Sequence, residues 1–303
     1  MAQTLKPNFQ GKVSLVVGGT SGIGKGFCEW LAMHGASVVV AGRNKQSGAE
    51  VIELMKKVAP QDLSPAPQYA FLPIDCFLIS DTRRFAAEFQ QQHPKLDYLV
   101  LSPGIATTQG RTETSEGVDQ KLAVHYFSRM AVIDGLLPVL EKTAAEEGAD
   151  VRVLSVFSGG VHSSYNLYKE DPEVKQNYTL KNAADASGMY NDIGLDSFSR
   201  EHPKISFTHA APGFVSTNWG TEMSFPLRML IRSIQVFGKS PLKCAEILGH
   251  SLYAPDFKGG FHVMSASGTH DKVTSIHEQA REPVWQTTRS LLDRFPGPTT
   301  SRS

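Results

Sequence analysis

Val16-Val17-Gly18-Gly19-Thr20-Ser21-Gly22-Ile23-Gly24 joins an apolar run to a series of spaced glycines, and a helix-compatible segment follows. Gly18 permits a tight turn, Gly22 lets a ligand approach the backbone without a Cβ in the way, and Gly24 allows close packing of helix on strand. A helix that begins here directs its unpaired N–H groups and the positive end of its dipole at an anion. The stretch therefore predicts a cradle for the phosphates of a dinucleotide.

The segments on either side place this turn in a βαβ unit. Residues 12–17 and 37–41 are short apolar runs, typical of strands buried on both faces. A glycine-rich turn without a ligand is the alternative for an isolated motif. The two flanking strands favour the cradle.

The end of the second apolar run bears on the choice of cofactor. A cofactor with a free ribose 2′-hydroxyl usually meets an Asp or Glu there, whereas this chain has Gly42-Arg43-Asn44. A guanidinium at that place gives a 2′-phosphate a bidentate partner. Arg43 thus favours NADP(H) over NAD(H), unless it is a solvated loop residue.

Composition narrows the class of protein. The chain has 303 residues with 30 basic and 30 acidic side chains, and 41% of its residues are hydrophobic, so nothing points to a nucleic-acid partner. The three cysteines are far apart and match no metal spacing, which favours a reduced intracellular setting. Residues 1–10 lack the apolar stretch of a signal peptide. We expect a cytoplasmic protein.

One apolar segment, Phe225 to Phe237, carries two arginines spaced by one helical turn. It is shorter than the roughly 20 apolar residues that span a bilayer. We interpret it as part of a lid over a substrate cleft, near residues 219–245, with shallow membrane contact as the second interpretation.

Strand-like and helix-like segments alternate along the rest of the chain. Strands are expected at 70–74, 96–101, 151–157, 205–210 and 259–264, and helices at 49–59, 81–93, 118–140, 180–200 and 275–295. Alternation of this kind predicts a single α/β domain over residues 11–303, after a short tail at 1–10. Its architecture is a Rossmann-like, doubly wound parallel sheet with helices on both faces and ligands at the carboxyl ends of the strands.

Several of these strand ends together resemble the short-chain dehydrogenases/reductases, from about Gly11 to Asn218. The nucleotide motif of that family is present with Val17 in place of its threonine. Asp75 is similar to the aspartate that contacts adenine, and Pro212 to Thr217 is similar to the stretch that holds the nicotinamide carboxamide. The resemblance and the glycine turn imply these cofactor-binding residues: Gly18, Thr20, Ser21, Gly22, Ile23, Gly24, Arg43, Asp75, Gly104, Val215 and Thr217.

The resemblance also implies a catalytic set. A serine after the fifth strand orients the substrate carbonyl, and Ser158 stands there. A tyrosine on the next helix exchanges the proton, aided by a lysine four residues later. An unperturbed phenol has a pKa near ~10, and a nearby cation lowers it toward neutral pH.

The tyrosine is harder to place. Tyr165 and Lys169 have the literal spacing, but Pro172 follows and would break the helix that must carry both. Tyr178 is the better placed candidate, with Asn182 four residues later and Lys181 displaced by about 100° around the helix. Counting back from Pro212 without a gap instead puts Asn182 or Ala184 at the tyrosine position, which leaves no acid.

His125 stands where the family has an asparagine that holds a proton-relay water. A histidine is able to hold water or carry a proton. A satisfied core histidine is the equal alternative.

We therefore expect an NADP-dependent oxidoreductase that passes hydride between nicotinamide and a hydrophobic alcohol or ketone. The alternatives are an NADP-binding pseudoenzyme or scaffold, and a non-redox catalyst on the same fold. A homodimer or homotetramer is expected if the apolar face of Val132, Leu136 and Leu140 pairs subunits, although these residues would serve equally to face the sheet.

Overall fold

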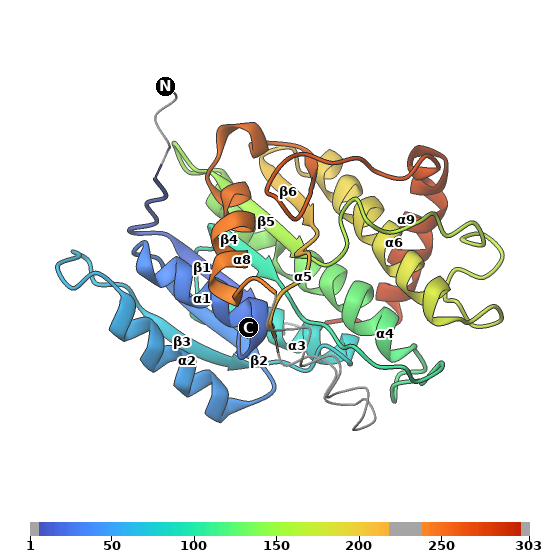
Figure 1. Cartoon of the computed structure of the whole chain (residues 1–303), viewed down its shortest axis with the longest axis horizontal. Coiled ribbons are helices and arrows are strands. Elements are labelled where there is room, and N and C mark those ends of the chain that lie inside the picture. Colours follow the sequence, from blue (N-terminus) through green and yellow to red (C-terminus); the bar gives the residue numbers. More distant parts are fainter. Residues whose placement is uncertain (1–5, 218–237, 298–303) are drawn as a thin grey trace, which may run out of the picture.

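Seven strands form one parallel sheet in the order β3-β2-β1-β4-β5-β6-β7. The computed structural model describes residues 6–217 and 238–297. The strands are β1 (Val13–Val17), β2 (Ser37–Gly42), β3 (Tyr69–Pro73), β4 (Tyr98–Leu101), β5 (Val151–Val156), β6 (Ile205–Ala210) and β7 (Phe261–Met264). This is the doubly wound sheet that the alternation of segments predicted, in one domain (Figure 1).

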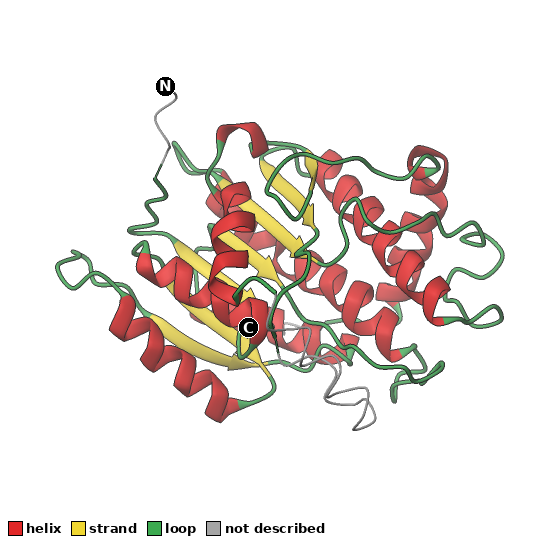
Figure 2. Ribbon diagram, viewed as in Figure 1, coloured by secondary structure: helices red, strands yellow, loops and turns green. Residues whose placement is uncertain are grey.

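Helices cover both faces of the sheet (Figure 2). One apolar cluster joins the sheet to α1 (Gly22–Met33), α2 (Lys45–Val58) and α8 (Pro241–Leu248). The other joins it to α3 (Ile79–Gln92), α5 (Ser128–Ala144), α6 (Leu180–Glu201) and α9 (His277–Asp293), and α9 lies against α6. Because both faces are covered, β4, β5 and β6 are buried at every position.

The long central helix is not regular. It begins as α4 (Gln120–Leu122), widens into a π-helical turn at η1 (Ala123–Phe127) and continues as α5. The predicted helix at 118–140 thus exists, but its irregular turn places His125 at the carboxyl edge of the sheet. Val132, Leu136 and Leu140 on α5 are buried in the monomer, so they face the core rather than another subunit.

The order of the strands reverses between β1 and β4, which opens a crevice at their carboxyl ends. Of the predicted lid at 219–245, residues 219–237 lie outside the described part of the chain. Residues 241–245 belong to α8, whose backbone at Pro241 lies against Gly26 of α1. Two short 3₁₀ turns, η2 (Gly249–Leu252) and η3 (Pro255–Phe257), complete the described elements. Within residues 6–217 and 238–297, no helix has both the length and the apolar character needed to cross a membrane.

Candidate functional site

A cavity of about 430 Å³ lies over the carboxyl ends of β1 to β4. The structure brings most of the predicted cofactor residues to its wall: Gly18, Thr20, Ser21, Gly22, Ile23, Arg43, Asp75, Gly104 and Thr217. Gly24 and Val215 are not among the residues that line it. Residues separated by as much as two hundred positions in the chain thus meet around one space, as the parallel sheet requires.

The glycine turn has the geometry that its sequence predicted. Gly18 adopts a left-handed φ of +81°, and a Cβ there would lie 2.8 Å from the backbone nitrogen of Pro103. A Cβ on Gly24 would lie 2.2 Å from the Gly18 carbonyl oxygen, so only glycine lets α1 begin this close to the turn. Ser21 caps α1 without a side-chain hydrogen bond, and the helix N-terminus faces the cavity. This end of α1 is suited to an anion.

Arg43 and Asp75 lie at the ends of β2 and β3, on the side of the cavity nearest α2. The Arg43 guanidinium is 5.0 Å from the centre of the Phe77 ring. Asp75 accepts a hydrogen bond at Oδ1 from the Phe77 backbone N–H, at 3.0 Å. Phe77 and Asp75 thus form a small platform, with an exposed cation beside it.

The segment after β4 is held by His125. The Ile105 N–H donates to His125 Nε2 at 3.1 Å, so Nδ1 is the assigned site of the ring proton. Burial, with the nearby charge of Arg129, lowers the pKa of His125 to about 3. The imidazole is therefore neutral near pH 7. Of the two interpretations of His125, the structure supports a satisfied buried histidine that positions Gly104 and Ile105.

Arg129 joins the ends of β4 and β5 below the cavity. Its guanidinium is fully buried and donates to the Pro103 carbonyl oxygen at 2.6 Å, to Ser155 Oγ at 2.7 Å and to the Val156 carbonyl oxygen at 3.0 Å. Burial lowers its pKa to about 9. Sequence reasoning missed this residue, because a lone arginine on a helix is usually a solvated one.

On the other side of the crevice, the loop after β6 reaches back to the glycine turn. Val215 is buried and pairs with Lys239 as an isolated parallel bridge. Thr217 lines the cavity, and its Cγ2 would be 3.4 Å from a Cβ on Gly22. This loop therefore closes the cavity on the side where the resemblance puts the nicotinamide.

Ser158 directly follows β5 and is held through its backbone. Its N–H donates to His209 Nε2 at 3.1 Å, and its carbonyl oxygen lies 2.8 Å from His162 Nδ1. Its Oγ lies 3.5 Å from the same nitrogen. Gly188 of α6 packs against this hydroxyl, since a Cβ there would be 2.6 Å from Ser158 Oγ.

Tyr178 lies in the loop that precedes α6, one residue before the N-cap Thr179. Its hydroxyl is buried and has no hydrogen-bond partner among the described residues, and the Lys121 ammonium lies 5.5 Å from the centre of its ring. No described hydrogen bond joins it to Ser158. Tyr178 as proton donor stays a prediction.

The residues that follow Tyr178 are engaged elsewhere. Lys181 forms an ion pair with Asp185 one turn along α6. Asn182 donates its backbone N–H to Thr179 Oγ1 at 2.9 Å and its side-chain amide to the Asn177 carbonyl oxygen at 2.7 Å. Both side chains serve the start of α6, and neither is shown beside the phenol. Tyr165 lies in irregular backbone outside the helices, as expected from the nearby Pro172.

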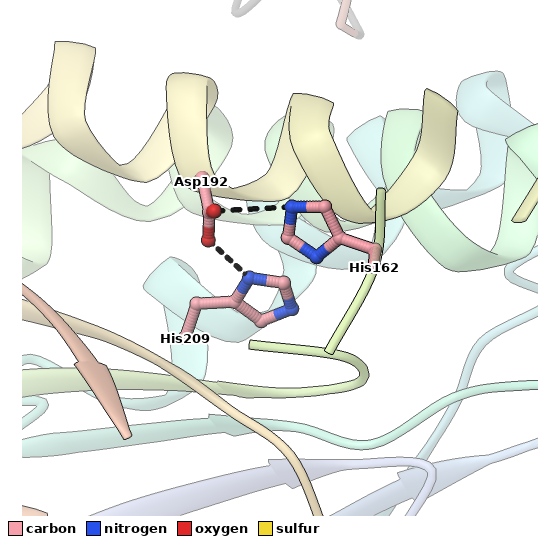
Figure 3. A group of neighbouring side chains, drawn as sticks. All are labelled: His162, Asp192 and His209. Carbon is pink, nitrogen blue, oxygen red and sulfur yellow. Dashed lines mark hydrogen bonds and ion pairs between the residues drawn. The ribbon is translucent and has the colours of Figure 1, made fainter. Parts of the chain in front are cut away.

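Ser158 contacts a buried cluster that sequence reasoning missed, formed by His162, Asp192 and His209 (Figure 3). His209 Nδ1 lies 2.6 Å from Asp192 Oδ1, and His162 Nε2 lies 3.2 Å from Asp192 Oδ2. The three side chains are almost wholly buried. They come from the loop after β5, from α6 and from β6, so no spacing in the sequence signals the cluster.

Comparison with known proteins agrees with this architecture. Residues 12–169 match the family model described as short chain dehydrogenase. An oxidoreductase of Emericella nidulans is 35% identical over 215 residues, which cover 70% of this chain and 61% of that protein. The polyprenol dehydrogenase of Mus musculus is 29% identical over 291 residues, which cover 92% and 83%. The chain thus spans about three fifths of the length of the first fungal relatives, and more of the mouse protein.

Solved structures share the fold at lower identity. A Pseudomonas aeruginosa RhlG/NADP active-site complex superposes with a TM-score of 0.61 at 20% identity, covering 87% of this chain and 98% of that one. A protein from Mycobacterium paratuberculosis superposes with a TM-score of 0.65 at 19% identity, covering 95% of each chain. With the sheet order, the glycine turn and the match of residues 12–169, these likenesses lead to one conclusion: the chain belongs to the short-chain dehydrogenase family.

Proposed function

We propose that this protein is an NADP-dependent oxidoreductase that transfers hydride between nicotinamide and a hydrophobic alcohol or ketone. The observation that carries the proposal is the cavity itself, whose wall includes the N-terminus of α1, Arg43 and Thr217. The residues fit a dinucleotide, because Gly18 and Gly24 leave no room for a Cβ and Gly22 keeps the turn open to a ligand. A bound nicotinamide would supply the hydride.

Arg43 supports NADP over NAD. Among the described residues that line the cavity, Asp75 is the only acid and Arg43 the only base. Arg43 directly follows β2, where a dinucleotide of this fold would bring its ribose. A 2′-phosphate would gain charge-assisted hydrogen bonds there, whereas NAD would leave the guanidinium without an anionic partner.

Apolar side chains at the same edge of the sheet support a hydrophobic substrate. Val161, in the loop after β5, has 69% of its surface exposed, and Phe214, in the loop after β6, has 42%. The mouse relatives named polyprenol dehydrogenase and retinol dehydrogenase carry names of hydrophobic alcohols. Ser158 would hydrogen-bond the carbonyl oxygen of such a substrate.

The test is a fluorescence titration with NADPH and with NADH, followed by oxidation of bound NADPH against long-chain ketones and aldehydes. Arg43→Ala should weaken NADPH binding by about 10-fold to 100-fold, the worth of charge-assisted hydrogen bonds, and change NADH binding little. Arg289→Ala, which removes a partly exposed arginine of α9 paired with Asp134, is the matched control. Equal affinity of the wild-type protein for both cofactors would refute the NADP preference.

An NADP-binding pseudoenzyme is the second candidate, and one observation favours it. Ala184, a position that ungapped counting gives to the catalytic tyrosine, is followed one turn later by Gly188. A Cβ on Gly188 would lie 2.5 Å from His162 Cγ, so no lysine fits at that position. Tight NADPH binding without oxidation by any carbonyl compound would support this function, or the non-redox one, over the oxidoreductase.

A further inference from the structure

The surroundings of His162 determine how many protons its ring carries. Nδ1 lies 2.8 Å from the Ser158 carbonyl oxygen, which only accepts hydrogen bonds. Nε2 lies 3.2 Å from Asp192 Oδ2, an ion-pair contact. Because each nitrogen faces an acceptor, the ring is best satisfied as an imidazolium with a proton on both nitrogens.

His209 has the opposite state. Its Nε2 accepts the Ser158 N–H, so its proton is assigned to Nδ1, which faces Asp192 Oδ1 at 2.6 Å. Both nitrogens of His209 are therefore hydrogen-bonded, and His162 joins the cluster through its ion-pair contact with Asp192. A charged His162, an ionised Asp192 and a neutral His209 leave the buried cluster with no net charge.

The electrostatics agree with this assignment. Burial alone would lower the pKa of His162, but the hydrogen bond and charge of Asp192 raise it overall. Burial would likewise raise the pKa of Asp192, and its two histidine partners lower it instead. For His209 burial dominates and lowers the pKa.

Packing of α6 explains why His162 reaches this place. Gly188 has no side chain, and the space that a Cβ would need is occupied by the His162 ring at 2.5 Å and the Ser158 hydroxyl at 2.6 Å. Asp192 lies one turn further along α6, and its carboxylate points from the helix toward His162 (Figure 3). On α6, Ala184 and Gly188 thus stand where the resemblance would put the catalytic tyrosine and lysine. The same face of α6 instead packs against His162 and Ser158 and contributes Asp192.

We propose that His162, held by Asp192, is the proton source of the reaction and delivers its proton through Ser158. The proposal rests on the proposed oxidoreductase function. A nicotinamide bound in the cavity would supply the hydride that the carbonyl carbon receives. The carbonyl oxygen takes the proton of the Ser158 hydroxyl. Ser158 Oγ takes the Nδ1 proton of His162, 3.5 Å away, and His162 becomes neutral.

The step leaves a ring that readily recovers its proton. Neutral His162 keeps its proton on Nε2, toward Asp192, and presents a bare Nδ1 to the Ser158 carbonyl oxygen. Two lone pairs then face each other, so His162 takes a proton back from solvent. In this network His162 and Asp192 act through Ser158, so the proton comes from His162 in place of Tyr178, the donor expected from the sequence.

The other charges near His162 fix the expected pH dependence. Asp185 on α6 adds negative charge, and it is paired with Lys181. Neutral His209 faces the cluster from β6, and the buried Arg129 acts on His209. Because the net effect raises the pKa of His162, carbonyl reduction should be fastest below that pKa and fall as the pH rises through it.

The first experiment reads the proton directly, by ¹⁵N NMR of histidine-labelled wild-type protein, with the signals of His162 assigned by their loss in His162→Gln. At pH 6, below the raised pKa, both His162 nitrogens should carry protons, whereas His209 should show one protonated and one bare nitrogen. Asp192→Asn should move the His162 titration to lower pH. A neutral His162 at pH 6 would overturn the proposal.

The second experiment separates His162 from Tyr178. His162→Gln should slow NADPH oxidation by roughly 100-fold or more, the usual size of acid–base catalysis, with NADPH affinity preserved. The alkaline fall in the pH profile should vanish in this variant and move to lower pH in Asp192→Asn. Tyr178→Phe should stay within a few-fold of the wild type.

The outcomes are distinguishable. An active wild-type protein whose His162→Gln variant binds NADPH and turns over equally well overturns this proposal alone, as does a loss of turnover confined to Tyr178→Phe. A wild-type protein that binds NADPH but oxidises it with no carbonyl compound overturns the oxidoreductase function, and the proposal with it. If His162→Gln fails to bind NADPH, the pH profile of Asp192→Asn tests the proposal instead. An alkaline fall that moves to lower pH supports it, and an unchanged profile overturns it.

Discussion

Among single residues, Gly24 shows how little room the nucleotide turn has. Gly24→Ala would place a Cβ 2.2 Å from the Gly18 carbonyl oxygen, and neither backbone segment can yield without moving α1 or β1. We expect a loss of about 1–3 kcal/mol in the free energy of unfolding, from overpacking, and weaker NADPH binding. Urea denaturation and cofactor titration measure both. Gly110→Ala is the control because its Cβ would meet open space, and an equally large loss there would contradict this explanation.

The sequence predicted some residues of the candidate site and missed others. Gly18, Arg43, Asp75 and Thr217 were predicted and meet at one cavity. Gly18, Arg43 and Asp75 closely follow the ends of β1, β2 and β3, whereas Thr217 was predicted from its resemblance to a family motif. His162, Asp192 and His209 were not predicted. These three side chains meet only because of the way α6 packs across β5 and β6. Gly188 leaves the space for His162, but a glycine within a helix gives no signal of this role in a single sequence.

At the scale of elements, the loop before α6 is organised by one carboxylate. Asp171 accepts backbone N–H groups from residues 175–177. Burial alone would raise its pKa, but these hydrogen bonds lower it overall. A lowered pKa contributes stability above the unfolded pKa, near ~4, and that stability is lost as the pH falls through the folded value. Unfolding in urea from pH 3 to 7 should therefore show a smaller acid-side loss of stability for Asp171→Asn than for the wild type.

The matched control is Asp62→Asn, which removes an exposed carboxylate from another loop. If both variants follow the acid-side slope of the wild type, Asp171 does not hold the loop in the way described.

The sequence predicted the strands and the long helices better than it predicted the irregular turn and the short helix. Apolar periodicity located every strand to within a few residues, since a strand buried on both faces has an unmistakable run of β-branched and apolar side chains. The π-helical turn at η1 and the short helix α8 were missed. The extra residue in η1 leaves the apolar pattern of the helix almost unchanged, and α8 is too short for its periodicity to stand out.

For the molecule as a whole, binding at the crevice should stabilise the entire domain, because the cavity is built from segments on both sides of the strand-order reversal. A ligand at 100 times its Kd adds roughly 2.7 kcal/mol to the free energy of unfolding. NADPH should therefore raise the Tm by several degrees, and NADH at the same concentration should raise it less. Thermal denaturation with each cofactor measures the difference. Identical shifts in wild-type protein and Arg43→Ala would show that Arg43 does not select the cofactor.

All three cysteines, Cys28, Cys76 and Cys244, are unpaired and buried. Burial raises the pKa of Cys76 to about 12 and that of Cys244 to about 11, and it raises the pKa of Cys28 as well. Thiols that stay protonated and inaccessible react slowly with maleimides and oxidants. The three natural cysteines should therefore not interfere with the labelling of an introduced cysteine. One cysteine introduced on the exposed face of α2, at Glu50, would carry a dye without any of the three natural cysteines being replaced.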